Sequence, residues 1–244
     1  ITKDGYITFE KGKRTKITNL ISDKYSDILR SEVDAILVGA NTDEVAQDTF
    51  QLYSCMLKLA PPTSRVNLQE AELAKVALNA YITTKISFAN YLGMLAEKVD
   101  STINVDNVTN TIGLDARIGT KYFKAGGPYG GTCFPRDTWA FEKISEKVGL
   151  SSAHMLANEK INDDVVTEIY KSIIESSPTS IGFIGLGFKP GTSVVTESMV
   201  IKLMKRLENY SGKIFIHDKL EETYTNLYRE FPKSRFYKTD SVGE

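Results

Sequence analysis

Blocks of hydrophobic residues in the first third of the chain predict a strand, a helix and then a boundary. The run AILVG at 35–39 is short, continuous and apolar, as expected of a buried strand. In residues 43–60 the apolar positions recur near helical spacing. Pro61 and Pro62 then interrupt any helix, so we expect a new structural unit to begin just after them.

A long helix is predicted beyond this boundary. Asn67 and Glu70 have the spacing of a capping box, in which two side chains accept hydrogen bonds from backbone amides at a helix start. An apolar stripe follows, and its small residues permit close contact with another helix, either in the chain's own core or at a subunit interface. Periodicity does not choose between the two. The stripe consists of Ile82, Ile86, Ala89, Gly93, Ala96 and Val99.

The middle of the chain is predicted to be mostly helical. A short helix at 106–112 should stop at Gly113, where a left-handed cap is sterically easy. Another helix follows Pro135, which suits the first position of a helix. A third runs through 162–176, where isoleucine and valine recur at steps of four.

After Pro178 the pattern changes to strand, helix, strand, helix. This β-α-β alternation implies parallel strands joined by a crossover, as in an α/β domain. Two strands make too small a sheet to cover both faces, so we expect the chain to be truncated here, and also at its start, which lacks an initiator Met. The strands are expected at 180–188 and 213–218, and the helices at 197–210 and 221–231.

The composition of the 244 residues allows two compact units with a sizeable core, since 41% are hydrophobic and 25% charged. Lys and Arg number 30 and Asp and Glu 31, which gives no reason to expect a polyanionic partner. The longest apolar runs are far shorter than the roughly 20 residues that span a bilayer. Two cysteines and two histidines fit a reducing compartment better than a zinc site. We therefore expect a cytoplasmic protein without nucleic-acid, membrane or metal binding.

The run GGTCFPRD at 130–137 carries the strongest chemical signal. Cys133 lies where the helix after it should begin, and the unpaired amides and dipole of a helix N-terminus favour the thiolate, the nucleophilic form. Arg136 adds positive charge, and the glycines let a substrate approach closely. Cys133 is therefore a candidate nucleophile, whereas Cys55, without these neighbours, is expected to be structural.

Two lysines have both a chemical and an ordinary interpretation. Lys75 stands four residues before Asn79 on the predicted long helix, so the two side chains share a face and could hold a substrate oxygen, or could simply form a solvated surface. Lys189 follows a predicted strand, where it could meet a phosphate or be an exposed turn residue. The glycines before Lys189 do not have the GxGxxG spacing of a dinucleotide-binding turn.

Together these segments resemble the UDP-glucose and GDP-mannose dehydrogenase family, over about residues 71–198. AELAKVALNAYITTKISFAN is similar to the family's central helix, and DARIGTKYFKAGGPYGGTCFPRD to its substrate loop and catalytic cysteine. GFKPGT, followed by ES, is similar to the opening of its C-terminal domain. Thr196 stands where the family's TDDxRES motif has an arginine associated with the cofactor.

This resemblance implies an α/β protein in which partial Rossmann-like domains flank a central, all-helical dimerisation domain with a long helix. Residues 1–66 would be the end of an NAD-binding Rossmann-like domain and 67–165 the central helical, catalytic domain. Residues 166–244 would form part of a C-terminal domain that binds the UDP-sugar. A homodimer would form through the long helix.

The resemblance also implies two successive hydride transfers to NAD that convert an alcohol to a carboxylate. Cys133 would attack the aldehyde intermediate to give a thiohemiacetal and then a thioester, which water hydrolyses. Lys75 and Asn79 would stabilise the oxygen that becomes anionic, and Asp137 would assist proton transfer. Arg136 would contact the cofactor.

The expected substrate is a UDP-sugar, because DARIG followed by KYFKAG is similar to UDP-glucose enzymes. Arg117 would bind it from the neighbouring subunit. The same chemistry on GDP-mannose or a UDP-N-acetylhexosamine, or a non-catalytic module that binds nucleotide sugars or dimerises, are the alternatives. The other residues implied in substrate binding are Tyr122, Phe123, Lys124, Tyr129, Gly130, Phe188 and Lys189.

Overall fold

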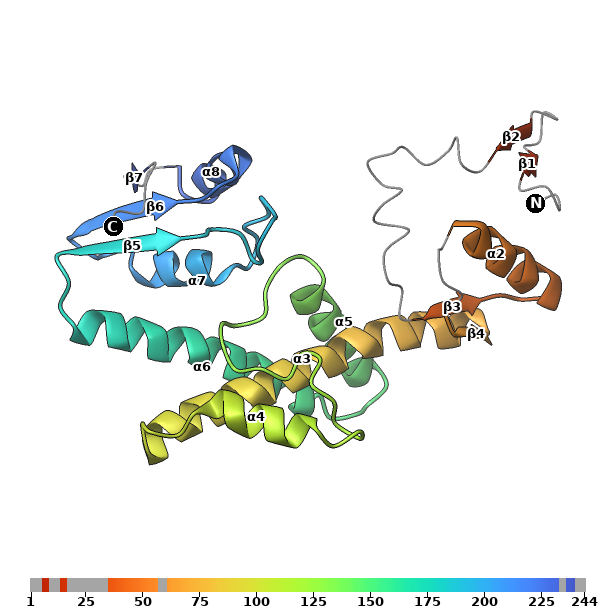
Figure 1. The fold of residues 1–244 in the computed structure, drawn as a ribbon, viewed down its shortest axis with the longest axis horizontal. Coiled ribbons are helices and arrows are strands. Elements are labelled where there is room, and N and C mark those ends of the chain that lie inside the picture. The colour runs from red at the N-terminus through yellow and green to blue at the C-terminus, as the bar shows by residue number, and fades with distance from the viewer. Residues whose placement is uncertain (1–5, 9–13, 17–34, 57–60, 233–235, 240–244) are drawn as a thin grey trace. The chain divides into compact units, whose positions relative to one another are not determined.

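The structure, a computed structural model, describes residues 6–8, 14–16, 35–56, 61–232 and 236–239 (Figure 1). The chain divides into two compact units, of which the first ends at Lys75 and the second begins at Val76. In the described ranges, none of the helices has the length and hydrophobicity needed to cross a bilayer.

The first unit contains the predicted strand and helix and three strands that were not predicted. Parallel pairing joins β3 to β4, so the chain crosses over through α2, as in an α/β unit. The sequence TSRV of β4 is polar and mostly exposed. Because it has no hydrophobic pattern, this strand was not predicted. The elements are β1 (Tyr6–Thr8) and β2 (Arg14–Lys16), which pair antiparallel, then β3 (Ile36–Gly39), α2 (Asp43–Met56) and β4 (Thr63–Val66).

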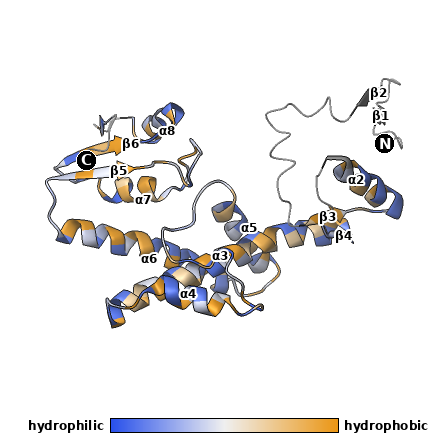
Figure 2. Cartoon of the chain, in the orientation of Figure 1, coloured by the Kyte–Doolittle hydropathy of each residue, from blue (hydrophilic) through white to orange (hydrophobic). Residues whose placement is uncertain are grey.

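The long helix α3 (Leu68–Val99) begins in the first unit and continues in the second. Its predicted capping box is confirmed: the Asn67 side chain accepts from the Glu70 amide, and the Glu70 side chain accepts from the Asn67 amide, both at 2.8 Å. Hydrophobic and hydrophilic residues mix along its whole length (Figure 2).

Only part of the predicted stripe on α3 lies in the core. Ala89 is fully buried, whereas Val99 at the other end is 68% exposed. A further buried face of α3 is lined by small polar residues, and an apolar pattern does not reveal it. These residues are Thr83, Ser87 and Asn90. Large apolar side chains are exposed along the same helix, among them Leu78, Tyr81, Phe88, Tyr91 and Leu95.

Three further helices follow in the second unit: α4 (Val105–Gly113), α5 (Phe134–Lys147) and α6 (Ala153–Glu175). The first two lie where they were predicted, whereas α6 begins well before the predicted start at 162. The predicted left-handed cap at Gly113 is wrong, because Gly113 is helical and the capping residue Leu114 is right-handed. A Cβ on Gly113 would lie 2.8 Å from the Thr120 side chain, so close packing explains this glycine.

The C-terminal part of the second unit is a parallel sheet in the order β5-β6-β7, with two helices. The β-α-β prediction is confirmed, and β7 is an additional short strand. Its core combines alternate strand residues such as Phe183 and Ile216 with Ile201 of α7, Leu227 of α8 and Val166 of α6. The elements are β5 (Ser180–Ile184), α7 (Met199–Arg206), β6 (Lys213–His217), α8 (Glu221–Glu230) and β7 (Phe236–Lys238).

Candidate active site

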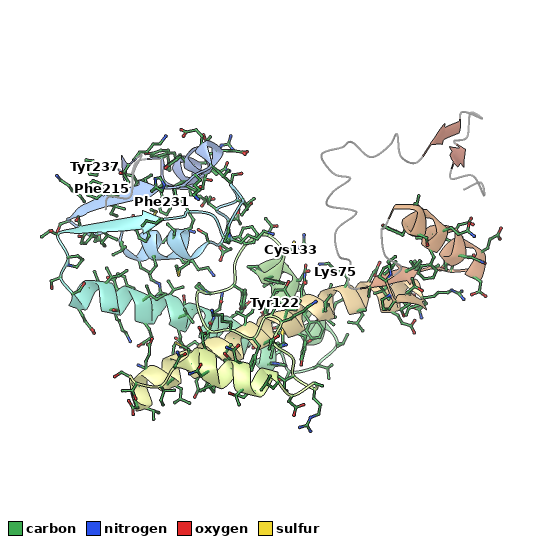
Figure 3. The ribbon with its side chains drawn as sticks, viewed as in Figure 1. Lys75, Tyr122, Cys133, Phe215, Phe231 and Tyr237 are labelled. Atoms are coloured by element: carbon green, nitrogen blue, oxygen red, sulfur yellow. The ribbon has the colours of Figure 1, made fainter. Side chains whose placement is uncertain are left out.

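Cys133 occupies the capping position of α5, as predicted (Figure 3). Its side chain makes no hydrogen bond to the amides of the helix it caps, and the residue is exposed. The thiol is therefore available to a ligand near a helix N-terminus. Pro135 is the second residue of α5, one place later than predicted, because Phe134 already has helical geometry.

Asp137 lies one helical turn after Cys133 and is 4% exposed. Asn79 on α3 donates from Nδ2 to one carboxylate oxygen of Asp137 at 2.6 Å. Arg136 donates to the other oxygen through Nε at 3.0 Å and Nη2 at 2.9 Å. These hydrogen bonds raise the pKa of the Arg136 guanidinium. The structure thus brings Asn79, Asp137 and Cys133 together.

A second contact reinforces this junction of α3 and α5. The hydroxyls of Thr83 and Thr138 are 3.0 Å apart and fully buried, one turn beyond Asn79 and next to Asp137. Lys75 lies on α3 one turn before Asn79, as the spacing predicted, and it is exposed. It is the last residue of the first unit.

The glycine-rich segment before Cys133 packs tightly against residues 188 and 196–197. The amide of Gly131 donates to the Thr196 carbonyl at 3.0 Å. A Cβ on Gly130 would lie 2.1 Å from the Glu197 carbonyl oxygen, and one on Gly131 would lie 2.6 Å from the Phe188 ring. Glu197 itself has a φ of 55°, which is strained for a residue with a side chain.

The aromatic residues of the predicted substrate loop have different environments. Phe123 is 5% exposed and stacks on Phe88 of α3 with ring centroids 6.1 Å apart. Tyr129 is 6% exposed, and its hydroxyl has no hydrogen-bond partner among the described residues. Tyr122 is 54% exposed and has a φ of 58°. Of these three side chains, only that of Tyr122 is open to a ligand.

The charged residues predicted to bind substrate are all exposed. Arg117 donates through Nε and Nη2 to the carboxylate of Asp115, and its side chain is 87% exposed. Lys124 pairs with Asp106 at 3.3 Å. Lys189 lies 5.4 Å from the centroid of the Phe188 ring. Asp115 thus orients the Arg117 guanidinium. The sequence pattern did not predict this role for Asp115.

Lys85 of α3 also supports the segment that carries Arg117. Its ammonium donates to the carbonyls of Ile118 at 2.9 Å and Gly119 at 3.3 Å, and it lies 5.8 Å from the centroid of the Phe123 ring. A lysine that points inward from a helix leaves no periodic signal, so the sequence did not reveal it.

Two glutamates of α6 should give opposite pH dependences of stability. Burial, together with the charge of Glu142, raises the pKa of Glu159, so its carboxylate destabilises the fold once the pH exceeds the ordinary glutamate range. Hydrogen bonds from Lys98 and Lys171 lower the pKa of Glu168, so its carboxylate stabilises the fold above that range.

We therefore expect Glu159→Gln to raise the melting temperature relative to wild type at about pH 7, with the gain vanishing at about pH 4. Glu168→Gln, the matched control on the same helix, should lower the melting temperature at the higher pH. This effect should shrink at about pH 4 and disappear only below the lowered pKa of Glu168. Scanning calorimetry at both pH values checks the signs. Equal shifts for the two variants would contradict the assigned environments.

Known proteins are similar to this chain over most of its length. Residues 69–164, which carry Asn79, Cys133 and Asp137, match the UDP-glucose/GDP-mannose dehydrogenase family, central domain. The chain is 34% identical over 212 residues to the UDP-glucose 6-dehydrogenase TuaD of Bacillus subtilis, covering 80% of this chain and 45% of that protein. It is 30% identical over 206 residues to the UDP-glucose 6-dehydrogenase AglM of Haloferax volcanii, covering 82% and 46%.

A solved structure shares the fold. The UDP-glucose dehydrogenase from the archaeon Pyrobaculum islandicum superposes with a TM-score of 0.78 at 30% identity, covering 86% of this chain and 48% of that one. The chain therefore contains a segment, residues 69–164, that matches the central domain of the UDP-glucose/GDP-mannose dehydrogenase family. It is an α/β protein with a long central helix, and it is similar to UDP-glucose 6-dehydrogenases. It spans about half the length of these relatives.

Proposed function

We propose that the chain belongs to an NAD-dependent nucleotide-sugar dehydrogenase that oxidises UDP-glucose to UDP-glucuronate through Cys133. The observation that carries the proposal is the exposed thiol at the start of α5, one turn from a buried aspartate that is held by Asn79. The similarity to UDP-glucose 6-dehydrogenases supports the substrate.

Cys133 is the nucleophile in this proposal. Its sulfur bonds to the carbonyl carbon of the sugar aldehyde, and the electron pair of the C=O bond moves to the oxygen. A hydride then leaves that carbon and a thioester remains, which water cleaves to release the carboxylate and the thiol. NAD, when bound, supplies the acceptor for this hydride and for that of the first oxidation.

Asn79 is suited to stabilise the oxygen that becomes negative. A side-chain amide has two N–H groups, and the bond to Asp137 at 2.6 Å uses one of them. The other can donate to an oxygen on the substrate. Because Asp137 fixes the amide, no reorganisation is needed when the charge develops. Lys75, one turn earlier on α3, supplies a positive charge on the same face in this proposal.

Asp137 is suited to move a proton to or from the reacting oxygen or the hydrolytic water. Its carboxylate accepts hydrogen bonds from Asn79 and Arg136 and lies one helical turn from the Cys133 thiol, where a carboxylate can take up or give a proton. Arg136 pairs with Asp137. We propose that its guanidinium also contacts the cofactor.

The turn after β5 does not fit a dinucleotide. In a Rossmann fold an acid at the end of the second strand receives the ribose hydroxyls. Here Asp218, just after β6, accepts the amide hydrogen of Leu186 at 2.8 Å and the amide hydrogen of Leu220 at 2.8 Å. The carboxylate is therefore occupied in holding its own turn. We therefore propose that the cofactor does not bind at this sheet.

A homodimer is part of the proposal. Arg117 is 87% exposed, and Asp115 fixes the position of its guanidinium at the surface, where a second copy of the chain could meet it. The exposed apolar side chains of α3, among them Tyr81 at 59% and Leu78 at 60%, form a surface suited to burial between two copies.

Titration calorimetry of the full-length protein tests the substrate assignment. We expect UDP-glucose to bind more tightly than GDP-mannose or UDP-N-acetylglucosamine, and Arg117→Ala to weaken its binding by about tenfold, since an ionic contact to a phosphate is lost. Lys147→Ala, an exposed charge change at the far end of α5, is the control and should bind like wild type. Tight UDP-glucose binding that Arg117→Ala leaves unchanged would contradict the role of Arg117. Absence of UDP-glucose binding would contradict the function.

A further inference from the structure

Two asparagines hold the glycine-rich segment before Cys133 by its backbone. Asn90 of α3 accepts the amide hydrogen of Gly126 at 2.8 Å and donates to the Gly127 carbonyl at 3.2 Å. Asn162 of α6 accepts the amide hydrogen of Tyr129 at 2.7 Å and donates to the Tyr129 carbonyl at 3.1 Å. Each side-chain amide thus pairs with backbone groups as a neighbouring strand would.

This pairing replaces secondary structure. The segment 124–130 is neither helix nor strand, so its polar backbone groups need other partners. Asn90 is 3% exposed and Asn162 is 5% exposed. Removing Asn162 leaves the buried backbone groups of Tyr129 unsatisfied, at a cost of about 1–3 kcal/mol, whereas the hydrogen bonds of Asn90 to Gly126 and Gly127 are part-buried and their loss should cost less.

The segment is in contact with several different elements. Asn90 and Asn162 lie on α3 and α6, whereas Gly130 and Gly131 pack against Glu197 and Phe188 beyond β5. The path of the backbone is therefore fixed at several points. Tyr129 is four residues before Cys133, so this path also sets where the loop stands relative to the thiol.

We propose that Asn90 and Asn162 are positioning residues that hold segment 122–131 in the conformation that receives the sugar nucleotide beside Cys133. The inference rests on the proposed function for the identity of the ligand. Asparagine suits this task because its amide offers a donor and an acceptor at the end of a short, stiff side chain. Neither residue needs to touch the substrate.

Asn158 supplies a matched control for the test. It lies one turn before Asn162 on α6 and is 4% exposed, but its side chain donates to Thr84 and not to the segment. Asn158→Ala therefore removes a buried amide of the same kind from the same helix. It should lower stability without loosening the segment.

The experiment measures amide hydrogen exchange over residues 122–131 in full-length wild type, Asn90→Ala, Asn162→Ala and Asn158→Ala. We expect the Gly126 amide to exchange faster only in Asn90→Ala and the Tyr129 amide only in Asn162→Ala, because each amide donates to the side chain that is removed. We also expect the dissociation constant for UDP-glucose to rise about tenfold in these two variants alone. Asn162→Gln, which keeps the amide on a longer side chain, should restore part of both losses and serves if an alanine variant does not fold.

Equal amide exchange over residues 122–131 in Asn90→Ala, Asn162→Ala and Asn158→Ala would overturn the proposal. So would faster exchange of the segment with unchanged UDP-glucose binding. If wild type binds no UDP-glucose, the proposed function fails, while the exchange data still decide whether the asparagines hold the segment.

Discussion

Replacing Cys133 with alanine is expected to lower the rate of UDP-glucuronate formation by about three orders of magnitude or more. Without the thiol no thiohemiacetal or thioester can form, and loss of a nucleophile costs enzymes at least this factor. Binding of UDP-glucose should change little, since the segment before Cys133 is held by other residues. The effect should therefore fall on kcat and not on the dissociation constant.

The measurement is NADH formation by the full-length protein, with Cys55→Ala as the control because Cys55 is the chain's other cysteine. Alkylation of the thiol by iodoacetamide gives an independent test: wild type and Cys55→Ala should lose activity, and UDP-glucose should protect both. Activity that survives in Cys133→Ala would contradict the nucleophilic role.

Gly130→Ala is expected to abolish tight binding of the sugar nucleotide and to lower the melting temperature. The new Cβ would lie 2.1 Å from the backbone oxygen of Glu197, a group that cannot rotate away. Either the segment before Cys133 or the turn before α7 must move, and misplacement of a substrate-positioning loop by about 1 Å can cost 10²-fold in rate. We expect a loss of that order in kcat/KM.

Gly182→Ala is the matched control. Gly182 lies on β5 with nothing within 4 Å of the added Cβ, so its replacement should change neither activity nor UDP-glucose binding. Steady-state kinetics and thermal melts of both variants make the comparison. Wild-type kinetics in Gly130→Ala would show that this close packing is not needed for the site.

The strongest local patterns were enough to predict most of the fold. The capping box at Asn67 and the β-α-β alternation after Pro178 depend on residues near one another in sequence, and both are present. The strand β4 was missed because its residues are polar and exposed, and β7 because it has only three residues. The cap at Gly113 was misread because a glycine can serve close packing as well as a left-handed turn.

The site was predictable where chemistry is concentrated in one motif, and less so where it depends on distant contacts. Cys133 and Asp137 share a helix turn, and their placement follows from the run GGTCFPRD. Asn162 contacts a residue 33 positions away, and Asn90 contacts residues 36 and 37 positions away. No spacing rule reports such pairs, because they are set by how α3 and α6 pack.

Packing against a helix that is distant in sequence also explains why two residues predicted to bind substrate are buried. Phe123 was implied in substrate binding, but its ring stacks on Phe88 of α3 at 5% exposure. Tyr129 is 6% exposed in the same way. Because these two side chains are buried, a ligand could contact only the backbone of Phe123 and Tyr129. An aromatic residue in a glycine-rich loop can either anchor the loop or bind the ligand, and sequence alone does not distinguish these roles.

Mass spectrometry of the full-length protein, acid-quenched during turnover of UDP-glucose with NAD, tests the central claim most directly. The account predicts that the peptide containing Cys133 carries the mass of a UDP-glucuronyl thioester, and that the adduct disappears on treatment with hydroxylamine. NADH accumulation with no adduct on that peptide, and with undiminished turnover in Cys133→Ala, would contradict it.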